Sequence, residues 1–442
     1  MKSISAVTSR LNFGVVVVCF FLIAGIVLLN YNLYGFDIFR KQKTPLVVEM
    51  IGRNSSSSSN SSDAGNSPSC PEYFRWIHDD LRPWRKSGIT EKMVEKGRKN
   101  ADFRLVVLNG NTYVETYRRS FQTRDIFTIW GILQLLRKYP GRIPDLDLNF
   151  FCGDLPRIKR SIFSLPVPLF SYCSNNKSDD IPFPDWSFWG WPEINIKPWT
   201  PLMEEIMEGN KKLQWVDRKP YAYWKGNPYV SGQKGVRVDL MKCNLTADAD
   251  WHARLFRQDW VSERKNGFRQ SNLVDKCKYR YMIYVEGNSW SVSQKYILAC
   301  DSAALLVTRR YHDFFSRGIV AMKHYYPIDI YNKCRSINKT VCFGNSHPRQ
   351  AQIVGKEGSE FIRRDLNMDR VYDYMFHLLN EYSKLIRFKP KLPENPIRVS
   401  SKSMSDKETG LVKKFMMDSK VKPFSSSSSI PCSLPPPFAG SL

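Results

Sequence analysis

Residues 279–307 predict a strand–helix–strand unit, the building block of an α/β fold. An apolar run at residues 281–285 predicts a buried strand, and a short Gly-Asn-Ser turn follows it. We expect a helix to begin near Ser289 or Ser291, and a second apolar strand at residues 303–307. Strands joined in this way favour a parallel sheet, because parallel neighbours need crossover connections.

The turn before this helix fits two interpretations. It could be an ordinary crossover, or it could bind an anion, because the first N–H groups of a helix lack internal partners and point outward. Gly287 would let a ligand approach the backbone closely, and Asn288 and Ser289 suit a helix cap. This segment alone leaves both interpretations open.

The N-terminal region predicts a membrane anchor. Residues 13–31 form an apolar run about long enough to span a thin bilayer, after a short cytosolic tail at residues 1–12. A cleaved signal peptide is the alternative, although no small-residue cleavage site follows the run. Residues 32–69, rich in Ser and Asn, predict a flexible lumenal stem. The expected topology is single-pass type II, in the Golgi or endoplasmic reticulum membrane.

Glycosylation acceptors and cysteines agree with a lumenal body. Asn-X-Ser/Thr triplets begin at Asn54, Asn60, Asn176, Asn244 and Asn338. One of the ten cysteines lies in the predicted anchor, and the other nine lack the paired C-x-x-C spacing of a zinc site. An oxidising lumen would allow disulfides among these nine, and an odd number leaves at least one without a partner in this chain.

The ordered body is expected at residues 70–390, followed by a low-complexity tail at residues 391–442. A body of about 320 residues is too large for one small core and suits two α/β lobes. The formal net charge of +24 would be compatible with nucleic acid, but the Lys and Arg residues are scattered and the body is expected in the lumen. A nucleotide diphosphate and acidic glycans or membrane surfaces are the more suitable partners.

Asp154 is a candidate catalytic residue because of its place after a strand. Residues 103–114 predict a hairpin, residues 125–138 predict a helix, and residues 145–152 predict the strand that precedes Asp154. Open α/β sheets carry their chemistry just beyond the carboxyl ends of their strands. A carboxylate in that position can act as a general base.

Two further features are candidates for ligand binding. Trp186, Phe188 and Trp189 belong to an aromatic, proline-containing loop, which could fill the space between lobes or stack against an acceptor sugar or peptide. Arg237 follows the turn after residues 222–226, where it could hold a diphosphate or lie solvated at the surface.

Together these stretches resemble glycosyltransferase family 90, which contains the Rumi protein O-glucosyltransferases and fungal capsule xylosyltransferases, and its plant branch in particular. The resemblance spans nearly all of the predicted body. The matching residues are 70–71, 73–74, 139–145, 153–156, 184–189, 223–226 and 278–302.

The resemblance implies a GT-B fold with two Rossmann-like lobes, a UDP-sugar donor, inversion at the anomeric carbon and no required metal. It assigns the catalytic base to Asp154. It implies donor contacts at Asn227, Arg237, Asn288, Ser289, Trp290, Ser291, Val292 and Ser293.

The sequence departs from the family pattern at two places. Animal members carry an arginine where this chain has Ser293, so donor affinity or donor choice is expected to differ. The peptide-recognition loop of the animal enzymes matches poorly after Pro192, which argues against a protein acceptor.

Two Asp-X-Asp triplets match the pattern that holds a divalent metal in a large class of sugar transferases. They begin at Asp145 and Asp248. The pattern is short enough to arise by chance, and Asp145 and Asp147 enter their strand at the end opposite Asp154. We therefore expect neither a metal site nor a cofactor.

The expected function is transfer of xylose or glucose from a UDP-sugar to a hydroxyl of a glycan or glycoprotein. Asp154 would accept the proton of the hydroxyl, and Arg237 with the helix N-terminus would hold the departing diphosphate. The alternatives are a non-catalytic lumenal glycan-binding or scaffold protein that keeps the fold, and a metal-dependent transferase that uses one Asp-X-Asp triplet.

Overall fold

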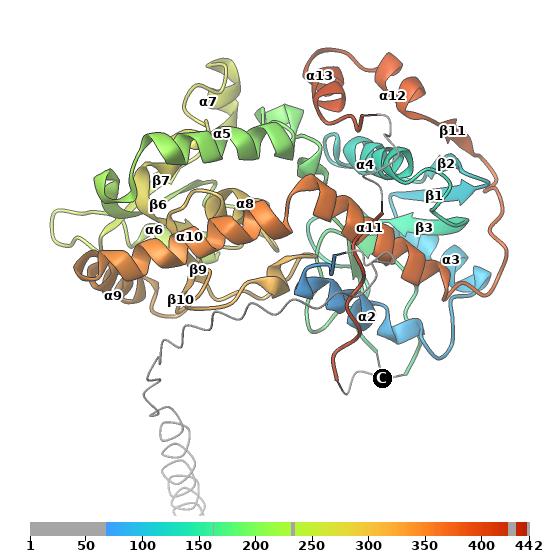
Figure 1. Cartoon of the computed structure of the whole chain (residues 1–442), viewed down its shortest axis with the longest axis horizontal. Helices are drawn as coiled ribbons and strands as arrows, with labels where there is room; N and C mark the ends of the chain where they lie inside the picture. Colours follow the sequence, from blue (N-terminus) through green and yellow to red (C-terminus); the bar gives the residue numbers. More distant parts are fainter. Residues whose placement is uncertain (1–67, 162, 231–234, 423–429, 440–442) are drawn as a thin grey trace, which may run out of the picture. The chain divides into compact units, whose positions relative to one another are not determined.

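The computed structural model describes residues 68–161, 163–230, 235–422 and 430–439 (Figure 1). The predicted cytosolic tail, the predicted anchor, nearly all of the predicted stem, and Asn54 and Asn60 lie outside these residues. Within the described ranges, no helix is long and apolar enough to cross a membrane.

The first sheet contains six strands in the order β11-β2-β1-β3-β4-β5. Pairing is antiparallel for β11 with β2, β2 with β1 and β1 with β3, and parallel for β3 with β4 and β4 with β5. Its strands are β1 (Phe103–Leu108), β2 (Asn111–Thr116), β3 (Leu146–Phe150), β4 (Phe170–Ser171), β5 (Ile181–Pro182) and β11 (Ile397–Val399).

The second sheet contains five strands in the order β10-β9-β8-β6-β7, all parallel. The predicted strands at 281–285 and 303–307 are confirmed as the neighbours β8 and β9, joined through α8 (Ser293–Leu298). All five residues of β9 are buried, as expected for a parallel strand that is covered on both faces. The strands are β6 (Lys219–Gly226), β7 (Ala253–Arg257), β8 (Tyr279–Tyr284), β9 (Ala303–Val307) and β10 (Tyr326–Ile328).

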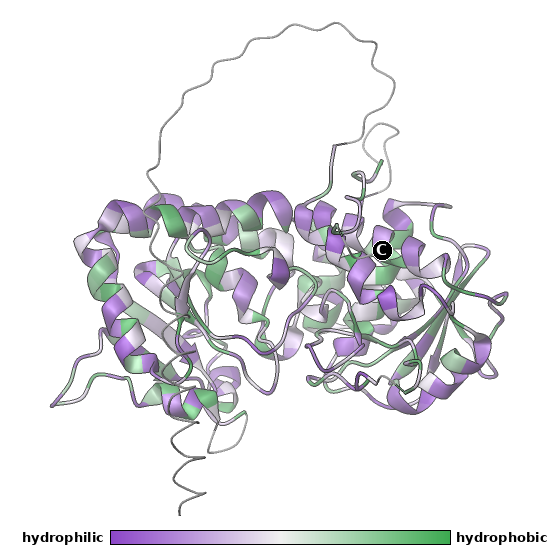
Figure 2. Cartoon of the chain, turned by 90° about the horizontal axis from the view of Figure 1, so that it is seen from below, coloured by the Kyte–Doolittle hydropathy of each residue, from purple (hydrophilic) through white to green (hydrophobic). Residues whose placement is uncertain are grey.

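The helices cover the sheets with their apolar faces, and hydrophilic residues occupy much of their outward faces (Figure 2). After α10 packs against β9 and α8, α11 contacts α2 and α4 and so returns the chain to the first sheet (Figure 1). The other α-helices are α2 (Trp76–Asp80), α3 (Glu91–Gly97), α4 (Arg124–Lys138), α5 (Trp199–Lys212), α6 (Val236–Met241), α7 (Trp260–Lys265), α9 (Lys333–Ser346), α10 (Pro348–Asp365), α11 (Met368–Ser383), α12 (Ser401–Lys407) and α13 (Gly410–Asp418).

These elements confirm the predicted α/β fold, and the parallel second sheet is Rossmann-like. The first sheet differs from that expectation because three of its five strand pairings are antiparallel. The cause is local: Asn109 and Gly110 form a two-residue turn with positive φ at both positions, and such a turn joins antiparallel strands. The predicted hairpin at 103–114 and the helix at 125–138 are confirmed as β1–β2 and α4.

The C-terminal segment corrects the prediction of a low-complexity tail at residues 391–442. The segment contains β11, which pairs with β2, and the helices α12 and α13, which follow it near α4 (Figure 1). Phe415 and Met416 of α13 are buried in the core, and Cys432 forms a disulfide with Cys70. The apolar side chains of α13 therefore hold this segment in the fold, although its Ser and Pro runs had predicted an unstructured tail.

Six cysteines form three disulfides, so the prediction of disulfide formation is confirmed. They join Cys70 to Cys432, Cys243 to Cys334 and Cys277 to Cys300. Among the described cysteines, Cys152 and Cys173 are buried free thiols and Cys342 is exposed. Disulfides of this number are typical of an oxidising compartment.

Candidate active site

Asp154 lies in the loop that follows β3, as the sequence predicts, and its carboxylate is held from two sides. Arg124, in the first turn of α4, donates to Oδ1 at 2.8 Å. Asn288, in the loop after β8, donates to Oδ2 at 3.0 Å. The carboxylate remains 39% exposed, so it is oriented by both partners and still accessible to a third group.

The loop after β8 also binds the backbone of Asp154. The buried hydroxyl of Ser289 donates to the Asp154 carbonyl oxygen, and the thiol of Cys173 approaches the same oxygen at 3.3 Å. The carboxyl end of β8 in the second sheet therefore meets the carboxyl end of β3 in the first. This contact brings together three residues that the sequence singled out separately: Asp154, Asn288 and Ser289.

The structure corrects the position of the helix that follows this loop. The helix α8 begins at Ser293 rather than at Ser289 or Ser291, and it is only six residues long. The N–H of Ser291 donates to the Tyr284 hydroxyl at 3.1 Å, and the N–H of Ser293 donates to the Ser291 hydroxyl at 3.4 Å. These two backbone groups already have partners within the loop, and donor binding at the other N–H groups of the segment stays a prediction.

Arg237 supplies a positive charge beside this loop. Its guanidinium donates to the carbonyl oxygens of Glu286 at 3.0 Å, Asn227 at 3.2 Å and Val285 at 3.3 Å. It forms no ion pair with any described carboxylate. Burial lowers the pKa of Arg237 to about 10, while the negative charge of Asp154 opposes this effect. A desolvated cation that is held only by carbonyls is a favourable place for an anion.

Gly287 brings the loop and this arginine close together. A Cβ at this position would lie 3.2 Å from Nη2 of Arg237, so a larger residue would displace the guanidinium. The side-chain oxygen of Asn227 is used locally, since it accepts from the N–H of Tyr229 at 3.0 Å. Asn227 therefore positions Arg237 through its own carbonyl oxygen.

Comparison with known proteins identifies the family of this chain. The model of the family described as "Glycosyl transferase family 90" matches residues 65–441, almost all of the described chain. The chain belongs to glycosyl transferase family 90. This confirms the resemblance seen in the sequence, whereas assignment to the plant branch stays a prediction.

Curated relatives of this family 90 member are identical to it at about a quarter of the aligned residues. Protein O-glucosyltransferase 1 of Homo sapiens is 26% identical over 73% of this chain and 82% of its own length. The O-glucosyltransferase rumi homolog of Anopheles gambiae is 25% identical, over 74% and 81%. The O-glucosyltransferase rumi of Drosophila melanogaster is 22% identical, over 75% and 82%. Each is similar to this chain across most of both sequences, and the chain is accordingly a glycosyltransferase.

Two lysines lie close to the position where this family 90 chain has Ser293. Ser293, whose hydroxyl is 2.9 Å from that of Ser291, lines a small cavity of about 40 Å³ together with Lys225 and Lys276. Burial lowers the pKa of Lys276 to about 8, and the charge of Lys225 contributes to the shift. A cation is therefore available near Ser293 even without an arginine there.

The other residues of the predicted donor segment serve mainly in packing. Trp290 is buried against Tyr172 and Trp186, and its indole N–H has no partner among the described residues. Val292 packs at the edge of the main core. Their predicted donor contacts stay predictions.

The aromatic loop corrects the expectation of an acceptor platform at Trp186, Phe188 and Trp189. All three rings are at most 1% exposed, so none offers a face to a ligand in this structure. Gly131 of α4 makes this packing possible, because a Cβ there would lie 2.4 Å from the Trp189 ring. The rings fill the core beside α4, which was the alternative interpretation of this loop.

The aromatic loop nevertheless supports the site through Arg124. The Arg124 guanidinium lies 4.1 Å from the centre of the Trp186 ring while it donates to Asp154. Sequence reasoning missed Arg124, although one signal was present. A cation in the first turn of a helix opposes the helix dipole and therefore needs an acidic partner, here supplied from 30 residues away.

Both Asp-X-Asp triplets have structural partners. Asp147 is fully buried and receives two hydrogen bonds from Arg104, at 2.7 and 2.6 Å, and Asp145 accepts from the N–H of Asn109 at 2.8 Å. Asp250 forms an ion pair with Arg254 at 2.9 Å. Asp147 therefore stabilises the first sheet at a distance from Asp154.

The three predicted glycosylation acceptors within the described residues differ in their surroundings. Asn176 is exposed. The side chain of Asn244 pairs with both backbone groups of Leu255, and Oδ1 of Asn338 lies 2.7 Å from Nδ1 of His252. Asn176 is therefore the acceptor that a glycan reaches with the least disturbance, and glycosylation at all three stays a prediction.

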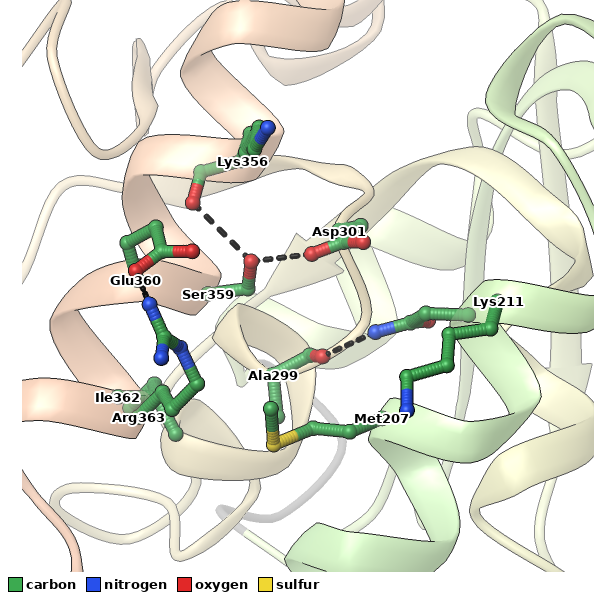
Figure 3. Close-up of a pocket in the computed structure, with 10 residues that line it drawn as sticks. Met207, Lys211, Ala299, Asp301, Lys356, Ser359, Glu360, Ile362 and Arg363 are labelled. Atoms are coloured by element: carbon green, nitrogen blue, oxygen red, sulfur yellow. Dashed lines mark hydrogen bonds and ion pairs between the residues drawn. The ribbon is translucent and has the colours of Figure 1, made fainter.

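One cavity of about 180 Å³ lies away from the site (Figure 3). Its lining includes Ala299 and Asp301, which precede β9, and Ser359 of α10, whose hydroxyl donates to Asp301. It therefore lies at the amino end of β9, whereas Asp154 meets the carboxyl end of β8. Parallel α/β sheets bind substrates at the carboxyl edge, so we assign no substrate to this cavity.

Proposed function

We propose that the chain is an inverting, metal-independent glycosyltransferase with a GT-B arrangement of its two sheets. The proposed reaction moves glucose or xylose from a UDP-sugar to a hydroxyl of a glycan or glycoprotein. The observation that carries the proposal is the half-exposed carboxylate of Asp154 near the half-buried guanidinium of Arg237, which pairs with no described carboxylate. The printed names of the relatives, O-glucosyltransferases, favour glucose as the sugar.

Asp154 has the geometry of a general base. In the proposed step, its carboxylate accepts the proton of the acceptor hydroxyl, and the hydroxyl oxygen forms a bond to the anomeric carbon. The bond from that carbon to the β-phosphate oxygen breaks, and its electron pair leaves with UDP. Arg124 and Asn288 hold the carboxylate in a fixed orientation, which lowers the entropic cost of reaching the reactive geometry.

The leaving diphosphate needs positive charge, and Arg237 is suited to supply it. Its guanidinium is already desolvated and held by three carbonyl oxygens, so little reorganisation accompanies the reaction. Lys276 adds positive charge near Ser293, where Lys225 is paired with Glu263 at 3.6 Å. These cations support a reaction that uses neither a metal nor another cofactor.

The proposed location is the lumen of the secretory pathway, with the chain held in the Golgi membrane by a single N-terminal anchor at residues 13–31. The three disulfides support the oxidising compartment. The proposed glycan acceptor is also consistent with that location.

The test is UDP release by the full-length chain against a panel of UDP-sugars, in EDTA, with a mixed glycan and glycoprotein acceptor pool. We expect release with UDP-glucose or UDP-xylose. Release that depends on added Mn²⁺ or Mg²⁺ would contradict metal independence. Failure of UDP to raise the melting temperature would remove the donor site and favour the glycan-binding alternative.

A further inference from the structure

A second cationic cavity lies at the end of β9, one strand along the sheet edge from the loop after β8. It has a volume of about 350 Å³ and is formed by residues that follow β9 and precede β10. The described residues that line it carry no carboxylate, and they include Arg309, Arg310, His312 and Arg317. The class of ligand that this cavity binds can be inferred from its position relative to Asp154 and from its charge.

The cavity is joined to the site through two contacts. Glu286, in the loop after β8, accepts from the N–H groups of Arg310 at 2.9 Å and Tyr311 at 2.8 Å. On the other side, His312 exchanges two backbone hydrogen bonds with Ser174, which follows Cys173, whose thiol lies 3.3 Å from the Asp154 carbonyl oxygen. The cavity therefore borders the loop that carries the proposed base.

The order of the strands assigns this cavity a role. The sheet runs β9-β8-β6, and Asp154 meets the loop after the middle strand, β8. The proposed donor residue Asn227 follows β6, with Arg237 just beyond it, so the donor lies on one side of the base. An acceptor that approaches the same base from the side opposite the donor enters where β9 ends.

The charges of the cavity leave one cation uncompensated. Arg310 forms an ion pair with Glu286 at 3.3 Å, and Arg317 forms one with Asp80. Arg309 donates to the carbonyl oxygen of Ser316 at 2.7 Å and pairs with no described carboxylate. Burial, together with the charges of Arg317, Arg309 and Arg160, lowers the pKa of His312 to about 3. The surroundings are thus electropositive, with Arg309 free to bind an anion.

A larger cavity continues from this one. It has a volume of about 510 Å³, and Asn176, His312 and Arg317 line both. Its wall combines the rings of Trp76 and Phe438, which are 4.8 Å apart, with several carboxylate, amide and guanidinium groups. Aromatic faces beside polar groups suit the CH-rich faces and hydroxyls of sugars, and a chain of several sugar units fits such a length better than a single small anion.

We propose that these joined cavities bind an acidic glycan as the acceptor, with the carboxylate of one uronic acid unit paired to Arg309. This inference rests on the proposed function, because it names the acceptor class of the same reaction. A charge-assisted contact of this kind orients the glycan so that a neighbouring hydroxyl faces Asp154.

The test is binding of trigalacturonate to the full-length chain by calorimetry, compared with its fully methyl-esterified form. We expect the acid to bind at least about tenfold more tightly than the neutral ester, and its affinity to fall with added salt. The variant Arg309→Gln should lose about tenfold in affinity, Arg309→Lys should retain most of it, and Thr308→Glu should weaken binding by repulsion at the exposed rim. Arg349→Gln, an exposed arginine on α10, is the matched control and should bind like the native chain.

Equal binding of acid and ester, no binding of either, or an equal loss in Arg349→Gln would overturn the proposal. Tighter binding of hexaglutamate than of trigalacturonate would replace the glycan with an acidic peptide. The UDP-dependent rise in melting temperature, measured on the same samples, separates the two proposals: Arg309→Gln should keep it. If the native chain lacks this rise, the proposed function fails rather than the acceptor assignment.

Discussion

Two arginines, one beside each sheet, have different partners: Arg104 of β1 is buried, whereas Arg237 of α6 is half-buried. In the first sheet Arg104 binds the carboxylates of Asp147 and Glu95, which raise the pKa of Arg104 above its usual range although burial opposes this. In the second, Arg237 binds only carbonyl oxygens, and burial lowers the pKa of Arg237. The first arginine stabilises the fold, whereas the second leaves a charge that a bound anion can neutralise. Arginines can therefore be assigned to stability or to binding by the partners of their guanidinium groups.

The largest expected effect comes from Asp154, which lies where the two regions meet. Asp154→Asn should reduce sugar transfer about 10²- to 10⁴-fold, because the amide cannot accept the proton of the acceptor. UDP should still raise the melting temperature. Asp248→Asn, in the exposed Asp-X-Asp triplet, is the control and should keep its activity. Loss of activity in the control alone would favour the metal-dependent alternative.

The next prediction removes the arginine of the first sheet. Arg104→Met should destabilise the protein by about 3–5 kcal/mol, because it leaves Asp147 buried without its partner. Urea unfolding measures this loss. The double variant Arg104→Met/Asp147→Leu should recover most of it, and both variants should bind UDP with native affinity. A tenfold loss of UDP affinity in either variant would contradict the assignment of Arg104 to stability alone.

Arg237→Gln should give the opposite pattern in the second sheet. We expect UDP affinity to fall about tenfold to a hundredfold, because a charge-assisted contact to phosphate is lost. Stability should be nearly unchanged or higher, because a desolvated cation has been removed. Arg237→Lys should rescue little, since an ammonium group cannot bind all three carbonyl oxygens in the same way. Calorimetric titration with UDP and urea unfolding of the same variants provide both readouts.

The smallest expected effect concerns pH. Burial lowers the pKa of His312 in the folded state to about 3. Between pH 6.5 and about 3, the unfolded chain therefore binds a proton at this residue that the folded chain does not. This contribution to stability is present above pH 6.5 and is lost as the pH falls. His312→Asn should therefore take up nearly one proton fewer on unfolding at pH 5. Unfolding curves at pH 7, 6 and 5 would show a shallower decline for the variant, and an unchanged decline would contradict the assignment.

The sequence predicts those features that depend on local patterns. Strand β9, the hairpin and α4 follow from apolar spacing and turn residues, and the place of Asp154 follows from the strand before it. The start of α8 could not be predicted because the Ser289 hydroxyl binds a carbonyl group 135 residues away in place of capping the helix. The contact between Arg124 and Asp154 could not be predicted for the same reason, because it joins two separate segments of the chain.

Burial was the second property that local patterns did not determine. The aromatic loop has the composition of a binding surface, yet Trp189 lies against Gly131 in the core, a contact between segments about 60 residues apart in sequence. The C-terminal helices were missed for a related reason. Phe415 and Met416 form a short apolar pair in a polar segment, and they are buried because α13 packs against residues 192–194, with Phe415 against Gly190.

The disulfide between Cys70 and Cys432 also bears on how the protein is made. Its cysteines are 362 residues apart, so at a synthesis rate of about 5–20 residues per second roughly 20–70 s separate their appearance from the ribosome. The chain can be closed into a covalent ring only after residue 432 has been synthesised. A chain that stops before residue 432 keeps a thiol at Cys70, and this thiol marks it chemically as unfinished.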